Sequence, residues 1–114
     1  MNTTTFDTEK AKRVESAVCS EFGCAICEIV SFRDSIFKKV VVFILSKHFG
    51  YDKRVLGHKY QMTYLYVPTV VEEMEFMIKT VPSFEEKINS VLKQVNDEKI
   101  LDTIGIRNFA AALS

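Results

Sequence analysis

The sequence contains no tryptophan, only two prolines, and no apolar run longer than the six residues at positions 40–45. A helix that crosses a membrane needs about 20 apolar residues, so the sequence predicts no membrane span and no membrane partner. Residues 1–10 are polar and acidic, and they lack the apolar stretch of a secretory signal. We therefore expect a cytoplasmic protein.

Cysteine is also scarce. Cys19, Cys24 and Cys27 follow the C-x4-C-x2-C spacing that opens a plant-type iron–sulfur site. A cluster or a structural zinc site needs a fourth ligand, and the chain has no fourth cysteine. Neither of its two histidines falls in a Cys/His ligand pattern. We expect buried structural thiols, with no metal and no cofactor.

Motifs of catalysis are missing as well. The sequence has no G-x-S-x-G, no Walker A loop and no H-E-x-x-H, and neither histidine has a carboxylate beside it in sequence. We therefore expect a protein that is not an enzyme, and we turn to binding functions.

The charges cancel, with 15 Lys and Arg against 15 Asp and Glu. Neutrality argues against a protein that coats nucleic acid by bulk charge. The charge is unevenly placed, however, because residues 31–60 hold seven basic and two acidic side chains. The segments on either side, residues 1–30 and 61–114, are both net acidic. A basic middle is thus the main charge feature of the chain.

With 114 residues, 47% of them hydrophobic, the chain has the composition of one compact domain with one core. Apolar residues recur at spacings of three and four, which predicts helices. We expect the first helix over residues 8–22, ended by Gly23, and a short apolar element over 25–30. Further helices are expected over residues 34–48, 52–58, 67–80 and 83–95.

Helix ends carry their usual signals. Asp34 is the predicted N-cap of the helix over 34–48, and Gly50 is its predicted stop. Pro68 suits the first turn of the helix that follows, where its missing N–H costs nothing. Ser83 is a predicted N-cap, with Glu86 at the capping-box spacing.

The apolar run at 40–45 is rich in β-branched residues, which leaves a strand as the alternative, but the length of the segment favours a helix. The other helices should pack around it. Residues 59–66 look like a connection, and residues 96–114 like a short helical extension or a tail beyond a domain at 1–95. The fold class is all-α, with five or six helices in a helix-turn-helix arrangement.

Several short motifs occur in the order of a known domain. Residues 18–23 end the first helix on an apolar residue and a Phe-Gly stop, Leu56-Gly57 is followed by Tyr60, and Thr69 begins Thr-Val-Val. Together with the closing helix, these motifs resemble the C-terminal DNA-binding domain of the bacterial replication initiator DnaA. That domain has a helix-turn-helix fold of the Trp-repressor-like type. The resemblance covers residues 18–95.

The resemblance implies DNA contacts. The family places a basic residue before its long helix, here Arg33, and a basic loop at the start of that helix, near Lys38 and Lys39. Thr69 matches the Thr of the recognition helix. The family signature before it, Gly-Arg-Asp-His, is replaced by residues 64–68, Tyr-Leu-Tyr-Val-Pro. The resemblance therefore implies the fold without the initiator's sequence specificity, and without its ATPase activity.

The first hypothesis is binding of double-stranded DNA, in replication or transcription control. Basic side chains of the middle segment would neutralise phosphates, and Thr69, with His58, would approach the bases. Lys38 and Lys47 lie about 180° apart on one helix, so they do not share a face. The predicted DNA-binding residues are Arg33, Lys38, Lys39, Lys53, Arg54, His58, Lys59 and Thr69.

The alternative is a helix-turn-helix scaffold used for protein binding, with a protein partner or a second copy of the chain. Three acids, Glu72, Glu73 and Glu75, follow Thr69 and mostly oppose approach to phosphates, although acids near a helix start also favour the helix dipole. Aromatic residues in the connection could stack on bases, pack on the core or enter a protein interface, and packing on the core or in an interface is favoured over base stacking. The predicted interface residues are Tyr64, Leu65, Tyr66, Glu72 and Glu73.

Overall fold

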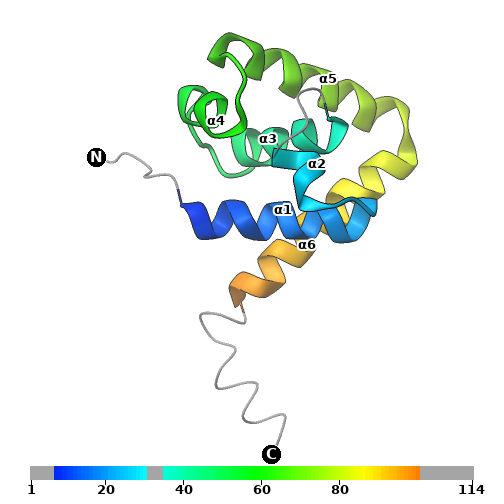
Figure 1. The fold of residues 1–114 in the computed structure, drawn as a ribbon. Coiled ribbons are helices and arrows are strands. Elements are labelled where there is room, and N and C mark those ends of the chain that lie inside the picture. The colour runs from blue at the N-terminus through cyan, green and yellow to red at the C-terminus, as the bar shows by residue number, and fades with distance from the viewer. Residues whose placement is uncertain (1–6, 31–34, 101–114) are drawn as a thin grey trace, which may run out of the picture.

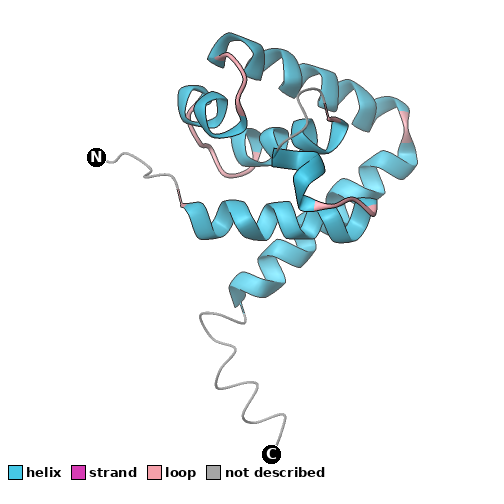
Figure 2. Cartoon of the chain, viewed as in Figure 1, coloured by secondary structure: helices cyan, strands magenta, loops and turns pink. Residues whose placement is uncertain are grey.

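The computed structural model describes residues 7–30 and 35–100, with the side chains of 97–100 left aside. Over these residues the protein is all-helical, which confirms the predicted fold class, and the helices are joined by short loops (Figures 1 and 2). The elements are α1 (Thr8–Phe22), α2 (Ile26–Val30), α3 (Ile36–Lys47), α4 (Lys53–Tyr60), the 3-10 turn η1 (Tyr64–Tyr66), α5 (Val67–Thr80) and α6 (Pro82–Ile100). No helix of the described residues is long and apolar enough to cross a membrane.

The ends of α1 follow the sequence signals. The Asp7 carboxylate accepts hydrogen bonds from the backbone N–H groups of Glu9 and Lys10, and so caps the first turn. At the other end Gly23 takes a left-handed conformation with φ of 70°, which glycine adopts without strain. The predicted bounds of this helix are confirmed.

Helix α3 is the centre of the bundle. Residues 40–45 are each no more than 2% exposed, and α1, α2, α4 and α5 all contact this helix (Figure 1). The predicted packing of the other helices around the apolar run is therefore confirmed. The predicted cap is corrected. The Ser35 hydroxyl caps the helix by accepting from the N–H groups of Phe37 and Lys38, and Asp34 lies outside the described residues.

An aromatic cluster joins α1 to α3 and to α6. The ring of Phe22 in α1 lies edge-on to Phe37 in α3 and to Phe84 in α6, with centroids 6.2 and 5.9 Å apart. Lys87 covers Phe22 from outside and donates a hydrogen bond to the carbonyl of Glu21. These contacts hold the C-terminal end of α1 against α3 and α6.

The segment predicted as a connection at 59–66 is more ordered than expected. It holds the last two residues of α4 and all of η1. Between them Gln61 ends α4 in a left-handed conformation, with φ of 60°, and the N–H of Met62 donates to the carbonyl of Gly57. The sequence did not predict η1, because a 3-10 turn of three residues is too short to show a recognisable period.

Helix α5 begins at Val67, next to Pro68, as predicted. Helix α6 begins at Pro82, one residue before the predicted start at Ser83. Pro82 is the first residue of α6, so Ser83 lies inside the first turn, and the carbonyl of Val81 accepts from the N–H groups of Phe84 and Glu85. Proline is favoured at the first helical position, so α6 begins at Pro82 and Ser83 is not its N-cap. The apolar face of α6 packs on α1 and α5. Its buried residues are Phe84, Ile88, Val91 and Val95.

Helix α6 runs on through residue 95, where we expected the domain to end, as far as Ile100. The remainder of the extension expected at 96–114, residues 101–114, lies outside the described part of the chain.

Gly57 provides a test of the turn between α4 and α5. A Cβ atom at this position would lie 2.6 Å from the carbonyl oxygen of Met62 and 3.2 Å from the backbone nitrogen of Tyr64. Alanine is normally better than glycine inside a helix, by about 1 kcal/mol. We expect the opposite effect at Gly57. The substitution Gly57→Ala should lower the free energy of unfolding by about 1–3 kcal/mol, because backbone atoms of the connection must move away from α4. Urea denaturation measures the change.

The control is Ser90→Ala, at an exposed position of α6, which should change the free energy of unfolding by less than about 0.5 kcal/mol. A Gly57→Ala variant more stable than the wild type would contradict the close approach of the connection to α4.

Candidate functional site

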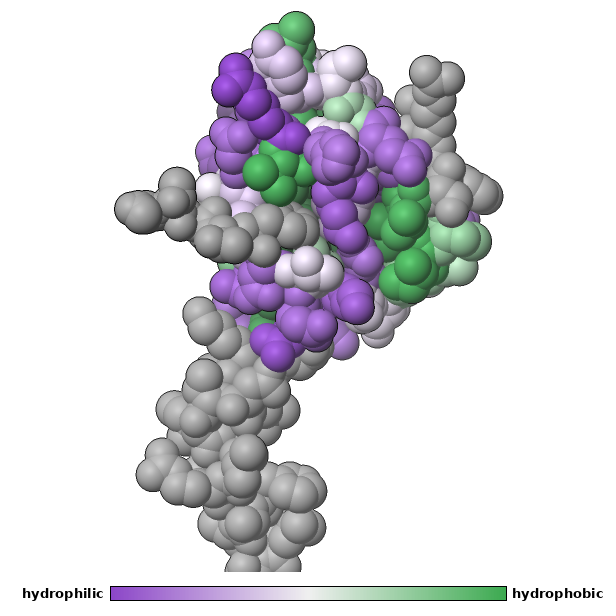
Figure 3. Space-filling model, turned by 60° about the vertical axis from the view of Figure 1, so that its left-hand side comes forward, coloured by the Kyte–Doolittle hydropathy of each residue, from purple (hydrophilic) through white to green (hydrophobic). Residues whose placement is uncertain are grey.

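Four of the predicted DNA-binding residues come together on α4. Lys53, Arg54, His58 and Lys59 are all exposed, and α4 carries no acidic residue. None of the four has an ion pair with another described residue. We call this set the α4 basic surface. Figure 3 turns the α4 side of the molecule forward and shows a face on which hydrophilic residues predominate, with smaller hydrophobic areas between them.

Tyr64 connects η1 to the α4 basic surface. Its ring lies 5.0 Å from the guanidinium of Arg54 and 5.7 Å from the ammonium of Lys53. Both distances suit cation–π contacts, which hold the two cations close to the start of α5. Tyr64 remains 38% exposed, so the ring also keeps a free part. Thr69 is exposed nearby in the first turns of α5.

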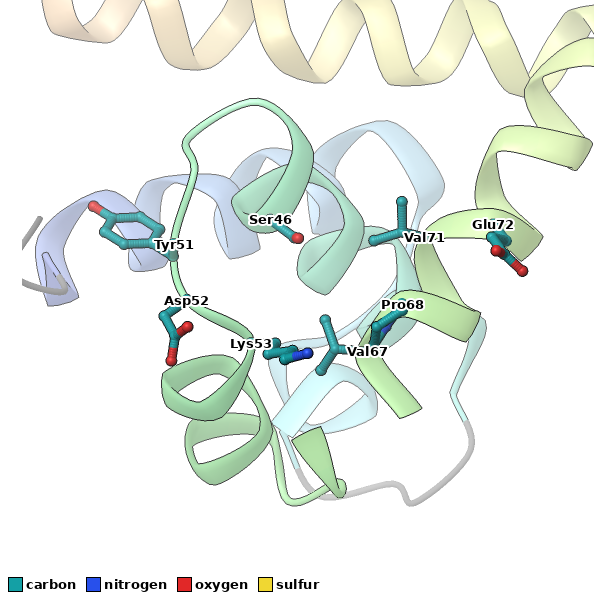
Figure 4. A pocket seen from close by; sticks show the side chains of 8 residues that line it. All are labelled: Ser46, Tyr51, Asp52, Lys53, Val67, Pro68, Val71 and Glu72. Carbon is teal, nitrogen blue, oxygen red and sulfur yellow. The ribbon is translucent and has the colours of Figure 1, made fainter. Parts of the chain in front are cut away.

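A groove of about 480 Å³ separates the start of α4 from the start of α5 (Figure 4). Val67 and Val71 point toward its centre, and Lys53 lies close to Val67 and Pro68, whereas Glu72 points away. The groove is therefore apolar inside and polar at its rim. It is lined by Ser46, Tyr51, Asp52, Lys53, Val67, Pro68, Val71 and Glu72.

A second hollow of about 420 Å³ lies on the other side of α4, next to the first residue of α1. Arg54, His58 and Lys59 line it together with Thr8 and Val55. Three of the four members of the α4 basic surface thus surround one concave area, although the nearby cap residue Asp7 is acidic.

The structure does not place the predicted cations of α3 on the same surface. Lys38 is only 1% exposed, so its ammonium does not reach a phosphate from this position, contrary to the expectation from the resemblance. Its place on the buried side of α3 follows from the helix itself, because position 38 shares a face with Val41, Val42 and Leu45. Arg33 lies outside the described residues.

Lys39 lies in an ion pair with Glu73, 3.2 Å from its Oε1 atom, and Lys47 lies 2.7 Å from Glu75 Oε2. Burial lowers the pKa of Lys39, but the hydrogen bonds to Glu73 and Tyr66 outweigh it, so the pKa is raised. The hydrogen bond from Lys47 lowers the pKa of Glu75. Both pairs join α3 to α5.

Two of the three acids expected on the recognition helix therefore belong to the α3–α5 junction. Glu72 differs from them. It is exposed and forms no ion pair with another described residue. The acidic character of the free α5 surface comes mainly from this side chain.

The outer face of α5 has an apolar character that we did not expect. Leu65 is 69% exposed and Phe76 is 65% exposed. The two residues are eleven positions apart; with three residues per turn in η1 and 3.6 in α5, they differ by about 60° around the helix axis, so they lie on one side of the continuous η1–α5 segment. Thr69 and Glu72 lie between them. Tyr66, predicted for the same interface, packs partly against the core. The 3.6-residue period of α5 places Phe76 on the side opposite the core, so the sequence alone contains the signal for this exposed apolar side chain.

A buried polar contact holds α4 in place. Tyr60 is 1% exposed, and its hydroxyl donates a hydrogen bond of 2.6 Å to Glu15 of α1, which is also buried. Burial and the neighbouring carboxylate both raise the pKa of Tyr60, because its ionised form would face Glu15 in a place that water does not reach. Sequence gave no signal for this contact, since the partners are 45 positions apart.

Two of the three cysteines lie side by side, and the third lies apart from them at the surface. No group of three or more metal-ligating side chains occurs among the residues that the structure describes. The Sγ atoms of Cys19 and Cys24 lie 3.7 Å apart, and Cys27 is exposed. Burial, followed by the contact with Cys19, raises the pKa of Cys24 to about 12, so Cys24 is a thiol at neutral pH.

Comparison with protein-family models, with curated proteins and with solved structures gives no match for this chain.

The buried pair of Tyr60 and Glu15 predicts how stability depends on pH. Above pH 10 tyrosine ionises in the unfolded chain, whereas Tyr60 keeps its proton in the folded protein. The folded state then binds more protons, so the free energy of unfolding falls as pH rises, by up to about 1.4 kcal/mol per pH unit from this residue. Urea denaturation of the wild type and of Tyr60→Phe at several pH values between about 9.5 and 11, on both sides of the ordinary tyrosine pKa, measures this fall.

We expect a shallower fall for Tyr60→Phe, although this variant is less stable at pH 7, by about 1–3 kcal/mol, since Glu15 loses its donor. Equal slopes for the two proteins would contradict the pairing. The comparison cancels the contributions of all other groups.

Proposed function

We propose that this chain is a helix-turn-helix protein that binds double-stranded DNA through α4 and the start of α5. The observation that carries the proposal is the α4 basic surface. It holds three cations and a histidine on a helix of eight residues that carries no acid. In helix-turn-helix complexes the first helix of the motif crosses the DNA backbone and the second enters the major groove. The cations of α4 suit the first role.

The arrangement of α4 and α5 supports the same proposal. A connection of six residues joins them, and Gly57 allows its backbone to approach α4 closely. Thr69 is exposed near the start of α5, where residues of a recognition helix contact base edges. The resemblance to the DnaA C-terminal domain assigns the same two helices to the motif. DNA binding would involve docking, without chemistry.

The proposal differs from that resemblance in the source of the phosphate contacts. The family uses the start of its long helix, but here Lys38 is buried and Lys39 pairs with Glu73. Contacts would shift to Lys53, Arg54 and Lys59. Three phosphate contacts give weak binding with modest sequence preference, because most of the base-reading residues of the family are absent.

A titration of a DNA duplex tests the proposal. We expect binding at low salt, with a slope of about −2.7 when log K is plotted against log salt concentration, since each of three phosphate contacts contributes about −0.9. The variant Lys53→Ala/Arg54→Ala/Lys59→Ala should bind at least about tenfold more weakly, with a slope near zero. Fluorescence anisotropy at several salt concentrations measures both.

The matched control is Lys12→Ala/Lys79→Ala/Lys93→Ala, which removes the same charge from exposed positions of α1, α5 and α6 and should keep the slope. Thr69→Ala changes no charge, so it should alter the preference among sequences and leave the slope as it is. Absence of binding at low salt would overturn the proposal, and so would an equal loss in both triple variants.

The outer face of α5 favours a second candidate function, the binding of a protein. Leu65 and Phe76 expose two large apolar side chains on one side of α5, with Thr69 and Glu72 between them and no basic residue among the four. Such a face opposes phosphates and suits an apolar surface. The partner that we propose is a second copy of the chain, since a two-fold interface uses the same patch twice.

Sedimentation velocity between about 1 and 200 µM, a range that brackets weak association, tests this second candidate. We expect a dimer at the high end, and a monomer throughout for Leu65→Ser/Phe76→Ser. Ile26→Ser, which changes an exposed apolar residue of α2, is the control and should dimerise like the wild type. A wild type that stays monomeric at every concentration would overturn self-association through α5.

A further inference from the structure

The end of α1 is closed by a left-handed glycine cap, and the side-chain contact across this cap is made by two thiols. The N–H groups of Gly23 and Cys24 both donate to the carbonyl of Cys19, at 2.9 and 3.2 Å. Such motifs commonly bring together two apolar side chains, one from the last turn of the helix and one from just beyond the glycine. In this protein those positions are Cys19 and Cys24, and their sulfur atoms lie 3.7 Å apart.

The surroundings hold this contact in place. The backbone between the two cysteines is fixed by the left-handed Gly23 and by Phe22, whose ring lies between Phe37 and Phe84. Both thiols are only partly buried, so a small molecule reaches the edge of the pair. Sulfur atoms already in contact need to move about 1.7 Å closer to reach the length of a disulfide bond.

We propose that Cys19 and Cys24 form an oxidative modification site, at which a small-molecule disulfide converts the thiol pair into an intramolecular disulfide that locks the C-terminal end of α1. The inference does not depend on DNA binding or on self-association. It assigns to the cysteines a role other than metal binding, for which the described residues offer no ligand set.

The reaction proceeds by two exchanges. The sulfur of Cys19, as a thiolate, attacks the small disulfide, forms a mixed disulfide and releases one small thiolate. Cys24 then loses its proton to solvent base and displaces the second small thiolate, so that the bond between Cys19 and Cys24 forms. In sum, two protein thiols and one small disulfide give one protein disulfide and two small thiols. The protein is oxidised and the small disulfide is reduced.

The disulfide and its formation have two expected properties. Because the pKa of Cys24 is raised to about 12, the second exchange is slow at neutral pH, and its rate rises about tenfold per pH unit. The new bond closes a short loop in the chain, which removes conformational freedom from the unfolded state. We expect the melting temperature of the oxidised protein to rise by about 5–10 °C.

Peptide mapping tests the site directly. The full chain is incubated with excess oxidised glutathione, the remaining thiols are alkylated, and the protein is cleaved after glutamate. Cleavage after Glu15, Glu21 and Glu28 puts Cys19 in the peptide 16–21 and Cys24 with Cys27 in the peptide 22–28. We expect these two peptides joined by a disulfide, with Cys27 alkylated or carrying glutathione.

Cys27→Ser is the matched variant and should still give the joined peptides, whereas Cys19→Ser and Cys24→Ser should not. The proposal is overturned if peptide 22–28 alone loses two hydrogens, which would mean a bond between Cys24 and Cys27. It is also overturned if glutathione stays on Cys27 without any joined peptide. A joined protein that melts no higher than the reduced one would overturn the lock.

Discussion

The burial of the middle of α3, residues 40–45, on all sides is the constraint on which the rest of the structure depends. Residues 40–45 are at most 2% exposed, and each buried side chain of this kind stabilises the fold by about 1.5–3 kcal/mol. A helix that is apolar all round must be covered by several others, and α1, α2, α4 and α5 provide that cover. The positions of these four helices follow from this requirement.

The polar ends of α3 complete the arrangement. Lys39, in its second turn, and Lys47, its last residue, both pair with glutamates of α5, so the two helices are joined by ion pairs outside a dry centre. Exposed ion pairs contribute little to stability, about 0–1 kcal/mol each. Their effect here is on the surface, because they match the charges of two lysines and two glutamates and leave α4 as the basic element.

Packing also places two surfaces of different character next to each other. The basic residues of α4 and the apolar residues of the outer α5 face are close in sequence, and Tyr64 lies at their junction, against Lys53 and Arg54. The buried hydrogen bond between Tyr60 and Glu15 holds α4 to α1, and the absence of a side chain at Gly57 lets η1 approach α4. The geometry of both candidate surfaces thus rests on contacts in the interior.

The sequence by itself determined the helices, because the spacing of apolar residues and the signals at Gly23 and Pro68 are local properties of the chain. It also determined that α3 is central, since an uninterrupted apolar helix has no other stable place. It missed the serine cap at Ser35 and misplaced the start of α6, where two local signals competed within two residues.

The candidate site was decided mainly by the tertiary structure. Lys38 and Lys39 are neighbours of one charge in the sequence, yet the first is buried and the second is paired with Glu73, 34 positions away. The contact of Tyr60 with Glu15, 45 positions away, likewise depends on how the backbone returns on itself. Composition and spacing determine which faces of a helix are apolar, but only packing decides which charges remain in water, because each partner comes from a distant part of the chain.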